Sequence, residues 1–158
     1  MSFAPEQFVE RMGAALAQAG LPRAPSVVFS ALLIDEDGRM TAAELARTLQ
    51  LSPASISGAV RYLAQLGMLR RERERGSRRD VYVVDDDAWH GAMLRRDQLY
   101  APMIAALDAG IAGSGGSGAG QRLWLTREFL TFVDSEMSAL TARWETRREE
   151  LAAGSPEG

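Results

Sequence analysis

The sequence predicts a mainly α-helical fold with one small β-hairpin, in which a helix-turn-helix stands directly before the hairpin. Two observations lead to this fold class. Apolar residues recur about every 3.6 positions along most of the chain, and the period changes to about 2 only after Gly67. Two helix starts also lie very close together, in the segment TAAELARTLQLSPASISG.

Two helices are predicted before this segment. In residues 4–20, Phe8, Met12 and Leu16 share one helical face, and Gly20 can end the helix. Residues 24–34 form the second helix, since Pro25 suits a first-turn position. The DEDGR stretch that follows is a turn signal.

The helix-turn-helix is predicted from two capping patterns. Thr41 and Glu44 match a capping box, in which each side chain bonds to the backbone of the other residue. Ser52 and Pro53 match an N-cap and the first position of a second helix. Two short helices with so tight a connection predict a helix-turn-helix. The buried stripe of the second helix is expected to contain Ile56, Val60 and Leu63.

The segment MLRRERERGSRRDVYVVD predicts two strands around a turn at Gly76 and Ser77. This register places Glu74 opposite Arg79. A helix-turn-helix followed directly by such a hairpin is a winged helix. One face of the first strand is expected to carry Arg71, Arg73 and Arg75.

The C-terminal part is predicted to be helical. Residues 85–111 form a helix that Pro102 kinks or divides. Residues 112–120 form a flexible loop rich in glycine and serine, and a long helix follows. Its apolar residues alternate at spacings of three and four, which suits a partner helix. The predicted dimer interface contains Phe8, Met12, Leu130, Val133, Met137, Leu140 and Trp144.

Charge is distributed unevenly. The chain has a formal net charge of -3, whereas residues 41–84 contain eight arginines and four acidic residues, a local balance of +4. A basic segment in an acidic chain favours a polyanion that approaches in one orientation. The competing interpretation is a solvated surface hairpin whose arginines are balanced by neighbouring acids.

Beside a helix-turn-helix, the basic hairpin favours DNA. Gly58 permits close approach either to the groove or to a neighbouring helix, and these two explanations stay open. At the hairpin tip, Arg78 is expected to enter a minor groove. The alternatives are that Arg79 enters it, or that the tip rests on phosphate. The predicted DNA-binding residues are Ser52, Ala54, Ser55, Ser57, Gly58, Arg61, Arg71, Arg73, Arg75, Ser77, Arg78 and Arg79.

Other classes of function are disfavoured. The chain has no cysteine, which removes disulfides and thiol chemistry, and its one histidine, His90, best fits a helix start. No catalytic motif is present, so we expect no enzyme, cofactor or metal. No apolar run approaches the roughly 20 residues of a membrane span, and no leader is evident, so we expect a cytoplasmic protein. Trp89, Met93, Tyr100, Trp124 and Phe129 belong either to core and dimer interface or to an effector cavity.

The segment from Gly20 to Trp89 resembles the GbsR-like branch of the MarR transcriptional regulators. The resemblance lies in TAAELARTLQLSPASISGAVRYLAQLGML and in the basic GSRRDVY that follows. It implies a homodimer that binds a pseudo-palindromic operator in double-stranded DNA. It also implies a ligand-responsive repressor, since many such proteins release DNA when a small molecule binds.

The expected domains follow from these assignments. Residues 1–20 form an N-terminal dimerisation helix, and residues 21–85 form the winged helix-turn-helix DNA-binding domain. Residues 86–152 form the C-terminal dimerisation region, and residues 153–158 a disordered tail. The alternative function is a winged-helix module that binds protein partners without base-specific DNA contacts.

Overall fold

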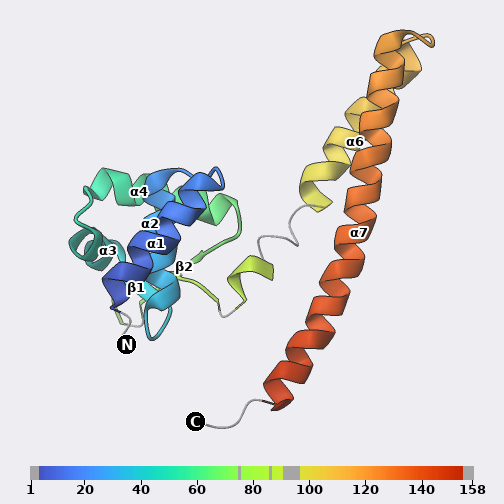
Figure 1. The fold of residues 1–158 in the computed structure, drawn as a ribbon. Helices are drawn as coiled ribbons and strands as arrows, with labels where there is room; N and C mark the ends of the chain where they lie inside the picture. The colour runs from blue at the N-terminus through green and yellow to red at the C-terminus, as the bar shows by residue number, and fades with distance from the viewer. Residues whose placement is uncertain (1–3, 75, 86, 91–96, 155–158) are drawn as a thin grey trace. The chain divides into compact units, whose positions relative to one another are not determined.

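The structure, a computed structural model, describes residues 4–74, 76–85, 87–90 and 97–154. The chain forms two compact units, residues 1–92 and residues 93–158 (Figure 1). The first unit contains α1 (Pro5–Gln18), α2 (Arg23–Ile34), β1 (Arg39–Thr41), α3 (Ala42–Leu49), α4 (Pro53–Gln65), β2 (Arg70–Arg73) and β3 (Asp80–Val83). The second contains α6 (Asp97–Gly113) and α7 (Gly118–Gly154).

The first unit is built around α2, which packs against α1, α3 and α4. At Gly13, α1 lies so close to α2 that an added Cβ would be 2.8 Å from Cγ1 of Val27. The hydroxyls of Ser26 and Ser30 are buried and donate to backbone carbonyls one turn earlier, so neither disturbs the core. The largest fully buried apolar side chains are Phe29, Leu32, Leu45, Ile56 and Leu63.

The predicted winged helix is confirmed, and its sheet has one strand more than expected. The three strands are antiparallel in the order β1-β3-β2, so β1 pairs with the second strand of the hairpin. Gly38 makes this pairing possible. Its φ is 62°, and a Cβ there would lie 2.9 Å from the carbonyl oxygen of Val84. The hairpin register, with Arg73 opposite Asp80, agrees with the predicted turn at Gly76 and Ser77.

The second unit is a helical hairpin, and its connection is shorter than predicted. Only residues 114–117 separate α6 from α7, whereas the sequence suggested a loop over residues 112–120. Gly120 is buried against the Ser114 side chain and leaves no room for a Cβ. Arg127 of α7 pairs with Asp108 of α6 at 3.0 Å.

Two further predictions about this unit need correction. The helix α6 continues through Pro102, so of the two expected effects the proline does not divide the helix, and a kink stays a prediction. The helix α7 reaches Gly154, two residues into the tail that the sequence predicted to be disordered. Within the described residues, no helix combines the length and apolar character that a membrane crossing requires.

Candidate nucleic-acid interface

The turn between α3 and α4 is fixed by local hydrogen bonds. The capping box at α3 is present, since the Glu44 carboxylate accepts from the Thr41 backbone N–H at 2.7 Å and the Glu44 N–H donates to the Thr41 hydroxyl. The bond from the Thr41 backbone lowers the pKa of Glu44, and the Thr41 hydroxyl adds to this effect. Gln50 then turns the chain in the left-handed region, at φ 52°, and Ser52 caps α4.

The helix α4 buries the predicted stripe and exposes the opposite face. Ala54, Ser57 and Arg61 are exposed, so they remain available to a groove. Ser52 and Ser55 are engaged with each other. The Ser55 N–H donates to the Ser52 hydroxyl at 3.1 Å, and the two hydroxyl oxygens are 2.9 Å apart. These two serines therefore shape the helix start, and one of their two hydroxyl hydrogens stays available to a base edge.

Gly58 stands on α4 with open space beside it. A Cβ added there would meet no described atom within 4 Å. The packing explanation for this glycine therefore finds no partner within the described residues. Close approach of α4 to a groove, at a residue that costs helix stability, stays a prediction from the sequence.

The wing arginines differ in how far their charge is already compensated. Arg71 forms an ion pair with Asp80 across the hairpin, and this hydrogen bond raises the pKa of Arg71. In contrast, Arg73, Arg78 and Arg79 form no ion pair with any other described residue. The free positive charge of the wing therefore lies toward its tip.

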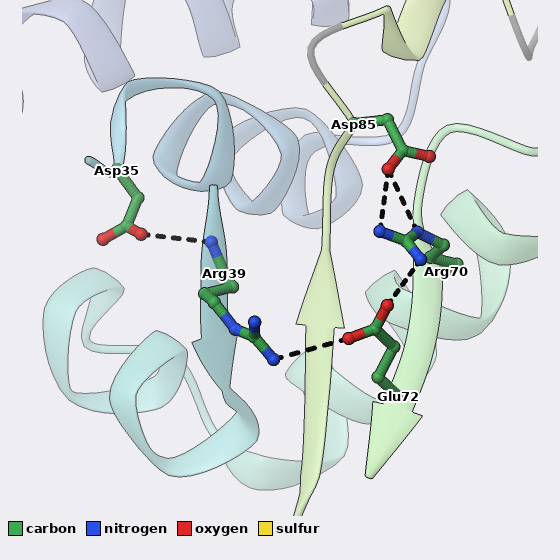
Figure 2. A network of polar contacts seen from close by, with 5 residues as sticks. All are labelled: Asp35, Arg39, Arg70, Glu72 and Asp85. Carbon is green, nitrogen blue, oxygen red and sulfur yellow. Dashed lines mark hydrogen bonds and ion pairs between the residues drawn. The ribbon is translucent and has the colours of Figure 1, made fainter. Parts of the chain in front are cut away.

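A chain of ion pairs crosses the base of the sheet (Figure 2). Glu72 of β2 contacts Arg70 on its own strand and Arg39 on β1, the latter at 3.4 Å. Arg70 also contacts Asp85 at 2.9 Å, and Asp35 holds the backbone N–H of Arg39 at 3.1 Å. These contacts link β1, β2 and the segment that follows β3, and they compensate the charges of Arg39 and Arg70.

The sequence interpretation treated the acids of the hairpin only as a general charge balance. Their specific partners depend on the strand register, because Arg71 and Asp80 lie diagonally across the β2–β3 pair. The alternation of arginine and acidic residues along the hairpin indicates that such ion pairs can form. Which residues pair can be predicted only when the position of the turn is known.

The wing tip is a tight turn. The Ser77 N–H donates to the Glu74 carbonyl oxygen at 3.1 Å, and Gly76 has a φ of 76°. Glu74 and Arg79 pair through their backbones, with the Glu74 N–H 3.0 Å from the Arg79 carbonyl oxygen. Their side chains form no ion pair with each other, and the positive charge of Arg79 instead acts on Glu44, whose pKa it helps to lower. Arg75 lies outside the described residues.

The predicted effector-cavity residues are divided between the units. Trp89 belongs to the first unit and packs edge-to-face on Phe29, with ring centroids 5.6 Å apart. Tyr100, Trp124 and Phe129 belong to the second unit. Met93 lies outside the described residues. The cavity therefore stays a prediction from the sequence.

The predicted dimer residues have very different exposures within the chain. Met12 is half-buried against the core of the first unit, and Leu130 is buried in the second unit. Val133 and Met137 are half-buried, whereas Leu140 and Trp144 are exposed. Phe8 is also half-buried. Phe132, which the sequence also suggested for core or dimer interface, is 62% exposed, and Leu125, which it did not suggest, is 61% exposed.

Comparisons with known proteins agree with this geometry. A model described as MmpR5-like MarR family transcriptional regulator matches residues 87–148, and a MarR family model matches residues 19–80. The chain is 27% identical over 146 residues to the HTH-type transcriptional regulator MmpR5 of Mycobacterium tuberculosis (strain ATCC 25618 / H37Rv). That alignment covers 91% of this chain and 88% of the relative.

A crystal structure of a transcriptional regulator also matches, with a TM-score of 0.81 and 26% identity. The match covers 90% of this chain and 98% of that chain. The two family models together span the winged helix and most of the helical hairpin, and both describe regulators rather than enzymes. The chain belongs to the MarR family of winged-helix, DNA-binding transcriptional regulators.

Proposed function

We propose that this regulator is a homodimer that binds a pseudo-palindromic operator and represses transcription until a small molecule releases it. The observation that carries the proposal is the combination, within one unit, of an exposed α4 face and uncompensated arginines at the wing tip. Side chains on an exposed helix face can read base edges, while contacts from wing arginines to phosphates carry no sequence information. The GbsR-like branch remains a prediction from the sequence resemblance.

In this proposal, α4 and the wing contact different parts of the DNA. Arg61 is the longest side chain on the exposed face of α4, so we assign it to a base edge. Arg73 is assigned to phosphate, since its guanidinium has no competing carboxylate among the described residues. At the tip, Arg78 is assigned to the minor groove, where A·T-rich sequence deepens the negative potential. Arg79 is the competing candidate.

The exposed apolar side chains of α7 support a dimer. Trp124, Phe129, Leu140 and Trp144 are between 41% and 62% exposed in the single chain. Apolar residues gathered in this way on one helix usually mark an interaction surface. A second copy would cover them and would give the protein the two-fold symmetry that a pseudo-palindromic operator requires. We therefore assign residues 86–152 to dimerisation, together with residues 1–20.

The test is selection of bound sites from random double-stranded DNA with the purified protein. We expect an enriched two-fold-related motif whose binding weakens steeply with salt. Arg61→Ala should change the preferred base at one position per half-site, at a cost of about 1–3 kcal/mol. Arg143→Ala, an exposed arginine on α7, is the matched control and should leave the motif unchanged. Recovery of no motif would favour a protein-binding module instead.

A further inference from the structure

The first unit contains an apolar groove of about 680 Å³, which falls in the size range of small-molecule sites. It lies along α1 and α2 and is bounded by β1 and the end of α3. Val9, Val27, Ile34, Met40 and Leu49 supply apolar lining. We propose that this groove binds an effector that carries a positive charge on an apolar body.

The charge of the effector follows from the rim. Glu6, Glu10 and Glu36 line the groove, are exposed, and form no ion pair with any other described residue. Asp35 also lines it, although its carboxylate already accepts two backbone N–H groups of the following turn. The single cationic lining residue is Arg23. The rim is therefore negative overall, which favours a cation and disfavours an anion of the same shape.

The room in the groove depends on small side chains. Ala24 and Ala31 line it on α2, where larger residues would fill the space. A second hollow of similar volume, about 690 Å³, lies at the wing, but Val81 is its single apolar lining residue. An effector with an apolar body therefore fits the groove and not the wing hollow.

The groove is connected to the DNA-binding helix through the turn. Thr48, Leu49 and Leu51 form part of its wall. Gln50 stands between the two leucines in the left-handed region, and Ser52, the next residue after Leu51, caps α4. A molecule that presses on the leucines therefore moves the start of α4. This regulatory consequence rests on the proposed function, whereas binding of a cation to the groove does not.

The first experiment compares two ions of one shape. Tetraphenylphosphonium and tetraphenylborate are titrated by calorimetry into the full-length chain without DNA. We expect the phosphonium to bind once per chain and the borate to bind at least about tenfold more weakly. Equal affinity for the two ions would overturn the proposal.

Two variants locate the site. Glu6→Gln with Glu10→Gln should weaken phosphonium binding by about fivefold, as expected for two exposed charge pairs. Glu136→Gln with Glu149→Gln makes the same charge change on α7 and should have no effect. Ala24→Phe should fill the groove and abolish binding, with folding checked by circular dichroism. Full binding by the carboxylate variant, or by a folded Ala24→Phe variant, contradicts the assignment.

A second copy of the chain is the competing occupant of the groove. In that case Ala24→Phe would lower the molecular mass measured by light scattering, and this result would overturn the effector site. The effect of the phosphonium on DNA binding is tested in a separate experiment. Saturating phosphonium should weaken operator binding by the same factor by which operator weakens phosphonium binding. Binding of both without any coupling refutes the effector role, whereas a chain that binds phosphonium but no DNA refutes the proposed function alone.

Discussion

Replacing Gly58 by alanine should make the protein more stable and a weaker DNA binder. Gly58 lies in the interior of α4, and an added Cβ meets no described atom within 4 Å. The substitution therefore gains helix propensity without a clash, which is worth about 1 kcal/mol. For a cooperative unit of this size, the melting temperature should rise by about 4–8 °C.

The effect on DNA binding has the opposite sign if α4 approaches the groove closely at this residue. An extra methyl group at a tight contact costs about 1–3 kcal/mol, which raises Kd about 5- to 150-fold. The assays are thermal unfolding followed by circular dichroism and fluorescence anisotropy with labelled operator. The two measurements use the same preparation, so loss of folded protein cannot explain weaker binding.

The matched control is Ala64→Gly, an exposed position in the same helix. It should lower stability by about 1 kcal/mol and leave DNA affinity unchanged. If Gly58→Ala binds operator as tightly as the wild type, the close approach of α4 at this residue is refuted.

Three further predictions concern the wing, the α3 cap and α7. Arg73→Ala should weaken binding to every duplex more than Arg71→Ala does, and Asp80→Asn should tighten binding severalfold by releasing Arg71. Fluorescence anisotropy at several salt concentrations tests both expectations. Equal losses of affinity for the two arginine variants would contradict the difference between Arg73 and Arg71. Glu44→Ala should cost about 0.5–1 kcal/mol at pH 7. Because its folded pKa is lowered, the Glu44 contribution is present above its ordinary pKa of 4.5 and is lost as the pH falls below that value, so chemical unfolding should show the wild type and the variant converging there. Leu140→Glu should shift dimers toward monomers in light scattering, and an unchanged mass would place the interface elsewhere.

Sequence patterns predicted the first unit well where the signal was local. The capping box at Thr41 and the cap at Ser52 are short-range hydrogen-bond motifs, and both are present in the structure. The buried stripe of α4 also follows directly from helical spacing, since Ile56 and Leu63 are fully buried. Each of these features is decided within a few residues of chain.

The missed features depend on contacts distant in sequence. Strand β1 has only three residues, too few to show a period of 2, and it exists because β3 pairs with it. The glycine-rich connection was predicted too long because composition does not reveal that Gly120 packs against Ser114. The compensation of Arg71 by Asp80 likewise depends on register and not on the number of charges.

The length of α7 has a consequence for how the protein responds to dilution. With 37 residues against 17 in α6, it is about 56 Å long and extends about 30 Å more than its hairpin partner. Most helical stability in proteins comes from tertiary packing, α6 does not reach along this part of α7, and Trp144 and Leu151 are exposed on it, so a second copy in the proposed dimer would stabilise it. Amide hydrogen exchange in this part of α7 should therefore slow as protein concentration rises, whereas exchange around Phe29 and Leu63 in the core of the first unit should not depend on concentration.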